Sequence, residues 1–198
     1  MKEVLIATNN QGKAKEFEAL FFPMGYTVKT LLDYPESIDV EETGTTFDEN
    51  AALKAETIAE KFRVMTIADD SGLIVDALNG EPGVYSARYA GKDKNDDANI
   101  DKVLQNLEGV ADNLRTARFH CSLAVRVPGK DTVIVSGQCE GSITRGRMGE
   151  NGFGYDPIFW VEDKQSTLAQ MTQQEKGAIS HRGQAIRKLG QLLPTIMN

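Results

Sequence analysis

The sequence has 198 residues, of which 40% are apolar and 26% are charged, as in an ordinary globular protein with a sizeable core. Its formal net charge is −7, which argues against nucleic-acid or membrane partners, because those surfaces select a basic face. We therefore expect a single domain over residues 1–198, in which a local group of lysines can still bind a small polyanion.

The first predicted strand is the apolar run Val4 to Ala7, which is typical of a central strand covered on both faces. It leads through the polar segment 8–13 into a predicted helix, whose apolar side chains recur at helical spacing: Ala14, Phe17, Leu20 and Phe21. A polar loop before a helix is a natural anion site, because free backbone N–H groups point into it. It is not a Walker A loop, and many α/β proteins begin in this way.

A second strand is predicted over Tyr26 to Leu31, and a helix from about Phe47 to Phe62. Thr46 and the acid three residues later form a capping box at the start of that helix. Asn50 and Lys54 are four residues apart and share a helix face. For Lys54 alone, a solvated face explains the pattern as well as a binding site does.

The apolar run Val64 to Ala68 predicts a short buried strand that ends in Asp69, Asp70, Ser71 and Gly72. Acids at the end of a strand are rigidly held and open to solvent, which suits a metal ion or a water that is to be deprotonated. The same residue types form turns. Taken alone, this stretch favours a simple turn.

A further helix is predicted over Asn99 to Leu107. After it, the segment Ala117 to Val127 alternates apolar and polar residues with the period of a strand. Pro128 and Gly129 then turn the chain into Thr132 to Cys139, so the pair predicts an antiparallel hairpin.

The two cysteines, Cys121 and Cys139, do not have the spacing of a metal site. Buried free thiols are expected in a reducing compartment. The apolar run near the beginning of the sequence is too short for a signal peptide, so we expect a cytoplasmic protein.

The segment 145–157 is dense in glycine and contains Phe153, Gly154, Tyr155 and Asp156. Glycines allow a ligand to approach the backbone closely, the two aromatic rings offer faces for stacking a base, and Asp156 can accept hydrogen bonds from a base edge. The alternative is a flexible surface loop, although such a loop gains little from exposing two aromatic rings.

The last predicted helix begins after Ser180, a residue type that often caps a helix N-terminus. His181 and Arg182 then fall in the first turn, where cations are unfavourable unless an anion compensates them. This local misfit indicates a binding site.

Together, the predicted loops supply cations, acids and aromatic faces: Lys13, Lys54, Lys176, His181 and Arg182; Glu41, Glu42, Asp69 and Asp70; Phe153 and Tyr155. Such a set suits a magnesium-bound polyphosphate that carries an aromatic base. Spacing alone does not show that these groups converge.

Six sequence blocks, in order along nearly the whole chain, resemble the inosine triphosphate pyrophosphatase family, the non-standard purine NTP pyrophosphatases (dITP/XTP diphosphatases). They are Thr8–Lys13; Glu41–Gly44 with Thr46, Phe47 and Asn50; Ala68–Leu73; Pro82–Tyr89; Gly152–Pro157; and Ile179–Gly183. The resemblance implies an α/β fold with an elongated mixed β-sheet flanked by helices, and two lobes around a central substrate cleft. It also implies a Mg²⁺-dependent homodimer that hydrolyses ITP, dITP and XTP to the monophosphate and pyrophosphate. This activity would cleanse the nucleotide pool and keep these bases out of DNA and RNA.

The resemblance also implies a role for each matching residue. The phosphates would be held by Thr8, Asn9, Asn10, Gln11, Gly12, Lys13 and Lys54. The metal would be held by Glu41 and Asp70, and Asp70 would also activate the attacking water, with Ser71 beside it. The base and sugar would be bound by Phe153, Gly154, Tyr155, Asp156, Lys176, His181 and Arg182.

Base selection would depend on the 6-oxo group that inosine and xanthosine share. A donor such as His181 or Arg182 would bond that group, whereas the 6-amino group of adenine would leave it unpaired. Whether Glu41 or Glu42 faces the metal stays open, because neighbours in an extended segment point in opposite directions.

Two other functions stay open. The first is a nucleotide-binding regulator without turnover, against which the combination of Asp70 with the Lys13 loop argues. The second is a pyrophosphatase of another class that acts on dUTP, other pyrimidine or cap-like substrates. Higher activity on dUTP than on dITP would support the second.

Overall fold

The computed structural model of the chain describes residues 2–8, 14–15, 17–18, 21–34 and 40–197. The chain forms two compact units. Unit 1 consists of Met1–Asp70, Cys121–Ser136 and Ala185–Asn198, and unit 2 of Ser71–His120 and Gly137–Gln184. Each unit is therefore assembled from segments that lie far apart in the sequence.

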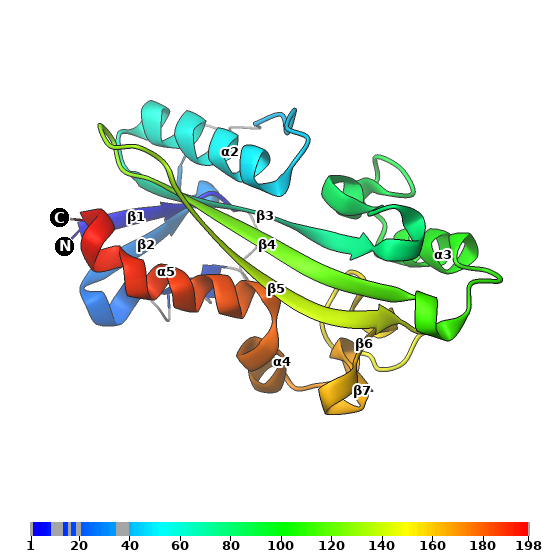
Figure 1. The fold of residues 1–198 in the computed structure, drawn as a ribbon. Helices are drawn as coiled ribbons and strands as arrows, with labels where there is room; N and C mark the ends of the chain where they lie inside the picture. The colour runs from blue at the N-terminus through cyan, green and yellow to red at the C-terminus, as the bar shows by residue number, and fades with distance from the viewer. Residues whose placement is uncertain (1, 9–13, 16, 19–20, 35–39, 198) are drawn as a thin grey trace. The chain divides into compact units, whose positions relative to one another are not determined.

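In the described residues, seven strands form one mixed sheet in the order β2-β1-β3-β4-β5-β6-β7 (Figure 1). They are β1 (Lys2–Ile6), β2 (Tyr26–Thr30), β3 (Met65–Val75), β4 (Thr116–Arg126), β5 (Val133–Ile143), β6 (Phe159–Val161) and β7 (Ser166–Thr167). β1 is parallel to β2 and β3, whereas β6 is antiparallel to β5 and β7. The mixed α/β class predicted from the sequence is confirmed.

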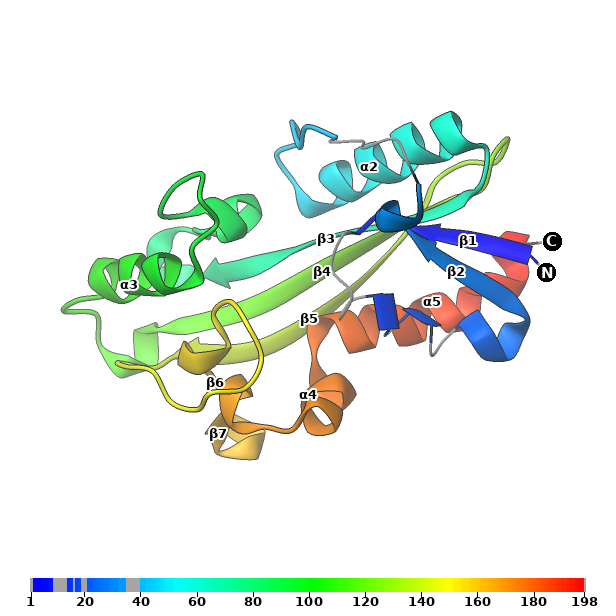
Figure 2. The same cartoon turned by 180° about the vertical axis from the view of Figure 1, so that it is seen from behind.

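In unit 1, helices cover both faces of the sheet (Figures 1 and 2). α2 (Phe47–Phe62) has the predicted bounds and the predicted Thr46–Glu49 capping box. Its alanines pack on alanines of β3 and β4 in one cluster: Ala51, Ala55, Ala68 and Ala124. Small side chains on both sides allow the helix to lie close to the sheet.

The opposite face of the sheet in unit 1 is covered by α5 (His181–Met197). Leucines of α5 join side chains of β1, β3 and β4 in a larger cluster that includes Val4, Ile6, Ile67, Cys121, Leu123, Leu189 and Leu193. Successive strand residues point to opposite faces, which is why Ile67 belongs to this cluster and Ala68 to the other. Residues 14–15, 17–18 and 21 are helical, and their apolar side chains Ala14, Phe17 and Phe21 are buried as predicted.

Unit 2 contains α3 (Asp96–Asn106) and α4 (Gln173–Ile179). The core of unit 2 is a cluster of apolar side chains from α3, from the unit 2 parts of the strands and from the segments between them. It includes Leu73, Ile100, Val103, Phe119, Tyr155 and Phe159. Short 3-10 helices fill the connections in both units: η1 (Phe22–Met24), η2 (Leu31–Asp33), η3 (Asp76–Leu78), η4 (Gly83–Arg88), η5 (Asp112–Leu114), η6 (Asp156–Ile158), η7 (Glu162–Lys164) and η8 (Leu168–Gln170).

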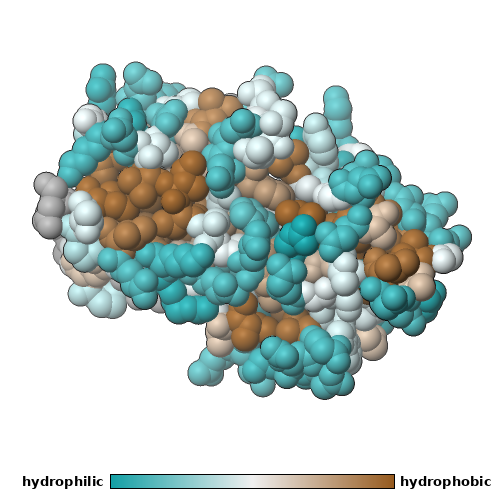
Figure 3. Space-filling view, in the orientation of Figure 1, coloured by the Kyte–Doolittle hydropathy of each residue, from teal (hydrophilic) through white to brown (hydrophobic). Residues whose placement is uncertain are grey.

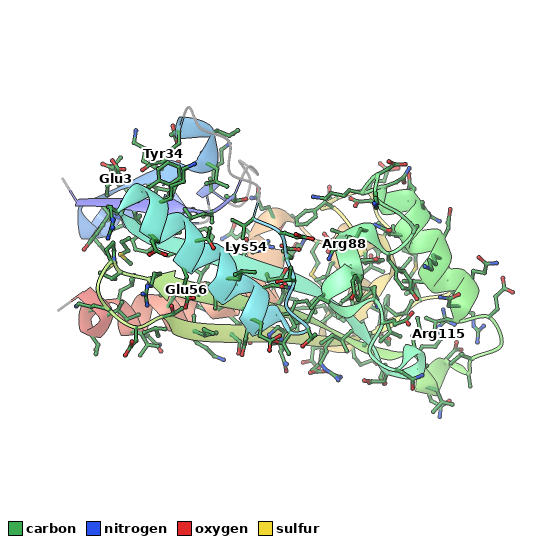
Figure 4. All side chains as sticks on the ribbon, turned by 90° about the horizontal axis from the view of Figure 1, so that it is seen from above. Glu3, Tyr34, Lys54, Glu56, Arg88 and Arg115 are labelled. Atoms are coloured by element: carbon green, nitrogen blue, oxygen red, sulfur yellow. The ribbon has the colours of Figure 1, made fainter. Side chains whose placement is uncertain are left out.

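Arg115 is a buried structural residue of unit 2 (Figure 4). Its guanidinium donates hydrogen bonds to the carbonyl oxygens of Leu107 at 2.8 Å, Ile143 at 2.8 Å and Thr144 at 2.9 Å. One side chain thereby satisfies the end of α3 and the end of β5, where backbone groups would otherwise be buried without partners.

The bounds of several predicted elements differ from the structure; β5, for example, ends at Ile143 and not at Cys139. The strand that was expected to end at Ala68 is β3, which continues through both aspartates to Val75. The acids therefore occupy a strand interior, because Leu73 and Val75 extend the buried pattern beyond the turn-forming residues. α3 begins at Asp96 and not at Asn99, because Asn95 caps it by accepting a hydrogen bond from the Ala98 N–H at 2.9 Å.

The surface of unit 1 carries an apolar area between α2 and α5, over the β4–β5 hairpin (Figure 3). Hydrophilic residues surround this area, and smaller apolar areas are visible elsewhere in the same view. Among the described residues, no helix has the length and apolar character needed to cross a membrane.

Candidate functional site

The first group of predicted site residues lies in unit 1, where β3 passes beside α2. Asp70 is only 8% exposed, and its Oδ2 accepts a hydrogen bond from Asn50 Nδ2 at 3.1 Å. Its Oδ1 lies 3.9 Å from Lys54 Nζ. Two residues of one helix face thus contact the two oxygens of one carboxylate, as their spacing of four residues permits.

Lys54 joins three separate groups in this cluster. Its ammonium donates to Glu42 Oε1 at 2.8 Å and to the backbone oxygen of Asp69 at 2.6 Å. Burial by itself lowers the pKa of Lys54, but the charges of Asp70 and Asp69 overcome it and raise the pKa overall. Lys54 is therefore a paired, largely buried cation and not part of a solvated helix face.

Two residues later on α2, Glu56 has a different surrounding (Figure 4). Its Oε1 accepts a hydrogen bond from Thr132 Oγ1 of the β4–β5 hairpin at 2.5 Å. The helix therefore uses one face for the charged cluster and another to hold the hairpin.

The carboxylate of Asp70 has a strongly shifted protonation equilibrium. Burial raises its pKa to about 6, and the nearby charges of Glu42 and Asp69 act in the same direction. Lys54 and the Asn50 hydrogen bond oppose that shift. A carboxylate with a pKa near 6 can accept a proton close to neutral pH, which is a property of general bases.

The structure distinguishes the two neighbouring glutamates. Glu42 is half-buried and bonds Lys54, whereas Glu41, named by the resemblance as a metal ligand, is exposed. The side chains of consecutive extended residues diverge, so Glu42 is the glutamate that joins Asp70 in the cluster.

A magnesium ion fits the donors of this cluster. Glu42 and Asp70 supply hard carboxylate oxygens, and Mg²⁺ commonly takes one or two carboxylates and completes its octahedron with waters and substrate phosphates. In the described part of the chain, no group of three or more His, Cys, Asp or Glu side chains is arranged as a metal site. Two carboxylates suit an ion whose remaining ligands are waters and the phosphate oxygens of a substrate.

The second group of predicted site residues lies in unit 2. Asp156 is buried, accepts a hydrogen bond from the backbone N–H of Phe153 at 3.0 Å, and forms a short ion pair with Lys176. Lys176 Nζ also lies 4.7 Å from the centre of the Phe153 ring. A Cβ at Gly152, where φ is +78°, would collide with the Asp156 carboxylate, so the glycine is needed for this closed turn.

The two aromatic rings of the glycine-rich segment have different surroundings. Phe153 is 55% exposed and offers a face for stacking. Tyr155, also expected to stack, is 5% exposed, packs in the core and donates its hydroxyl hydrogen bond to the Ser86 oxygen at 2.7 Å. Tyr155 therefore anchors the segment, and burial raises the pKa of its hydroxyl.

His181 and Arg182 are buried at the start of α5. The His181 imidazole stacks on Phe119 with ring centres 4.9 Å apart and an interplanar angle of 14°. Ser180 Oγ accepts a hydrogen bond from the Gly183 N–H at 3.1 Å, as the predicted cap requires. This arrangement fixes the plane of a donor-bearing ring beside a helix start.

The remaining predicted residues are placed only in part. Thr8 is buried just after β1, and Ser71 follows Asp70 within β3. Gly154 donates its N–H to Asp96 Oδ2 at 2.9 Å. The predicted phosphate-binding residues Asn9, Asn10, Gln11, Gly12 and Lys13 lie outside the described residues.

Sequence reasoning missed the hydrogen bond from Asn50 to Asp70, although it placed Asn50 on the same helix face as Lys54. It also missed Ser86, which holds Tyr155 and, through its Oγ, accepts a hydrogen bond from the Leu73 N–H at 2.9 Å. Ser86 is a buried small polar residue, and no local pattern distinguishes it from other serines.

Several known proteins are similar to this chain. The model of the Ham1 family matches residues 4–192. A dITP/XTP pyrophosphatase of Bacillus anthracis is 57% identical over 196 residues, covering 98% of this chain and 97% of that protein. A protein of the same name from Bacillus subtilis (strain 168) is 55% identical over 193 residues, covering 98% of each.

Solved structures give the same result. The Ham1 protein of Staphylococcus aureus superposes with a TM-score of 0.92 at 48% identity, covering 98% of this chain and 99% of that one. A nucleoside-triphosphatase / dITP/XTP pyrophosphatase from Mycobacterium abscessus gives a TM-score of 0.81 at 40% identity, covering 94% and 97%. The resemblance to the inosine triphosphate pyrophosphatases is confirmed, and the chain belongs to the Ham1 family.

Proposed function

We propose that this chain hydrolyses dITP, ITP and XTP to the nucleoside monophosphate and pyrophosphate, which removes non-standard purines from the nucleotide pool. The observation that carries the proposal is the largely buried charged cluster in unit 1, where Lys54 lies between Glu42 and Asp70. Charged groups are rarely buried together without a function or a partner. The names of the close relatives support the same activity.

The reaction needs a water molecule that attacks the α-phosphorus while the bond to the bridging oxygen of the β-phosphate breaks. Asp70 takes the proton of that water, since its pKa of about 6 leaves it mostly ionised at neutral pH. Lys54 offsets negative charge that builds on the leaving pyrophosphate. Glu42 and Asp70 would hold Mg²⁺, which supplies charge neutralisation and a bound water of lowered pKa.

Unit 2 supplies the groups that recognise the base. The exposed face of Phe153 stacks on a purine, and Asp156 and Lys176 keep the Phe153 turn in place. His181 and Arg182 supply the donors for a 6-oxo group, which adenine lacks. Thr8 and the segment that follows it, together with Lys54, bind the phosphates.

We also propose that the protein is a homodimer and that it is located in the cytoplasm. The apolar area of unit 1 (Figure 3) is the kind of surface that contacts between protein chains bury, which supports the homodimer that the family resemblance implies. Both free thiols are buried, as in proteins of a reducing compartment, which supports a cytoplasmic location. Light scattering during gel filtration would test the dimer, which a monomeric mass at micromolar concentration would contradict.

The decisive experiment measures pyrophosphate release in the presence of Mg²⁺ from dITP, XTP, dGTP, dATP and dUTP. We expect strong preference for dITP and XTP, with the monophosphate as the second product. Equal rates on all five would contradict base selection by His181 and Arg182. Preference for dUTP would indicate a pyrophosphatase of another class, and no release from any substrate would favour a binding protein without turnover.

A further inference from the structure

The side chain of Asn50 connects two segments of unit 1 that carry proposed metal ligands. Asn50 lies in the first turn of α2 and is 0% exposed. Its Oδ1 accepts a hydrogen bond from the Gly44 N–H at 2.8 Å, and its Nδ2 donates to Asp70 Oδ2 at 3.1 Å. Gly44 is two residues after Glu42, so the amide connects the segment of one carboxylate with the strand of the other.

The chemistry of the two partners fixes the orientation of this amide. The Gly44 N–H can only donate, so the amide oxygen must face it, and the amide nitrogen is then left to face Asp70. The Asp70 carboxylate accepts that bond on Oδ2, which leaves Oδ1 on the side of Lys54. An asparagine satisfies both partners because it carries a donor and an acceptor on one rigid group.

The backbone of the glutamate segment is shaped to reach this amide. A Cβ on Gly44 would lie 2.6 Å from Asn50 Oδ1 and 2.7 Å from Glu49 Cβ. Real Cβ atoms do not approach other atoms so closely, so the glycine permits the approach. The contact depends on Gly44 and Asn50 together.

We propose that Asn50 is a positioning residue for the hydrolysis: it orients Asp70 and holds the Glu42 segment at the distance that a shared metal ion requires. The inference rests on the proposed function, because it assumes that these two carboxylates hold the metal. Side chains that orient metal ligands through hydrogen bonds commonly change metal affinity or activity about 10-fold to 100-fold when they are removed. Asn50 touches neither proposed base-binding groups nor phosphate-binding residues among its hydrogen bonds in the described chain.

The test uses Asn50→Leu, which keeps most of the volume, removes both hydrogen bonds and adds no charge. We expect kcat for dITP to fall about 10-fold to 100-fold, with KM within about threefold of wild type, and the Mg²⁺ concentration for half-maximal activity to rise about 10-fold. In the absence of nucleotide, the increase in Tm on adding Mg²⁺ should shrink. Gly44→Ala should act in the same direction with a smaller effect, and it decides the matter if Asn50→Leu does not fold.

Ser122→Ala is the matched control. Ser122 is buried and donates a hydrogen bond to Asp48 Oδ1 at 2.5 Å, so it holds the same first turn of α2 through a residue other than Asn50. We expect it to lower Tm while kcat and the Mg²⁺ response stay at wild-type values. A purely structural Asn50 would give the same result as this control, and that outcome would overturn the inference.

The Mg²⁺-induced change in Tm separates failure of the inference from failure of the proposed function. If wild type releases no pyrophosphate from dITP or XTP, the proposed function fails, and the inference then depends on Mg²⁺ binding alone. A smaller Mg²⁺ effect in Asn50→Leu than in wild type supports it. An equal effect, or no Mg²⁺ effect in wild type, overturns it.

Discussion

The two groups of site residues are built in different ways. In unit 1, Asp70 and Lys54 extend from the interior of an 11-residue strand and from a capped 16-residue helix, and a buried acid lies beside a largely buried lysine. In unit 2, Phe153 lies in a turn that Asp156 holds through the backbone. The proposed proton acceptor thus lies on a rigid element, whereas the proposed stacking face lies on a loop, where its surroundings can vary without disturbing the chemistry.

The largest expected effect is on the unit 1 cluster. Asp70→Asn removes the proposed proton acceptor and should lower turnover of dITP by about a thousandfold or more, within the range for a general base that also holds a metal ion. The fold should persist, because the amide keeps the shape of the carboxylate. Pyrophosphate release and circular dichroism measure the two properties, and a turnover equal to that of wild type would show that another group takes the proton.

Asp70→Asn also tests how the ionisation of Asp70 affects the free energy of unfolding when no metal ion is bound. The pKa of Asp70 is about 6 in the folded chain and 3.8 ordinarily, so the folded chain binds the proton more tightly. The contribution of Asp70 to the free energy of unfolding is therefore most favourable below pH 4 and falls as the pH rises to about 6. The change is on the order of 2 kcal/mol.

Urea unfolding at pH 4.5 and pH 7, in buffer with a metal chelator, measures this difference. Asp70→Asn should lack the decrease, so at pH 7 it should be more stable than wild type. If the free energies of unfolding of the two proteins change with pH in the same way, other interactions must cancel the effect of burial on the pKa of Asp70.

A pair of variants sharpens the contrast within unit 2. Phe153→Ala should raise KM for dITP about 10-fold, since the loss of a stacked ring costs about 1–3 kcal/mol, while Tm stays within about 2 °C. Tyr155→Phe should do the opposite: it removes the bond to Ser86 and lowers stability by about 1 kcal/mol, with little effect on KM. A large rise of KM in Tyr155→Phe alone would reverse the two assignments.

The smallest effect concerns the thiols, one of which lies in each unit: Cys121 in unit 1 and Cys139 in unit 2. Burial raises the pKa of Cys139 to about 11, with the charges of Glu140 and Asp156 adding to it. Reaction with iodoacetamide at pH 8 should be slow at both cysteines. Because the proposed Mg²⁺ ligands lie in unit 1, Mg²⁺ should slow the reaction a few-fold further at Cys121 only. Mass spectrometry measures the two alkylation rates. If Mg²⁺ slows both rates equally, the two cysteines become accessible in one unfolding event.

The sequence predicted the elements of this fold well where one periodicity dominates. The bounds of α2 and the hairpin of β4 and β5 follow from capping and alternation. It was wrong about the end of β3, because the turn-forming Asp69, Asp70 and Ser71 are overridden by sheet neighbours that no local pattern shows.

The site was predicted in residue types more than in geometry. Family resemblance named Asp70, Lys54 and Asp156, but it could not tell that Tyr155 packs inward, since an aromatic residue beside glycine suits a core as well as a surface. Which of Glu41 and Glu42 faces Lys54 depends on the direction of the side chain. A shift of the segment by one residue would reverse that direction, and the sequence does not show the register.

The cluster that joins β1 to α5 has a consequence for folding during synthesis. Val4 and Ile6 bury their side chains beside Leu189 and Leu193, which follow them by almost the whole length of the sequence. β1 is therefore translated long before α5, and one of its apolar faces stays uncovered until α5 has been made. Nascent chains of this protein should need a chaperone or the early packing of Phe17 and Phe21 to protect that face.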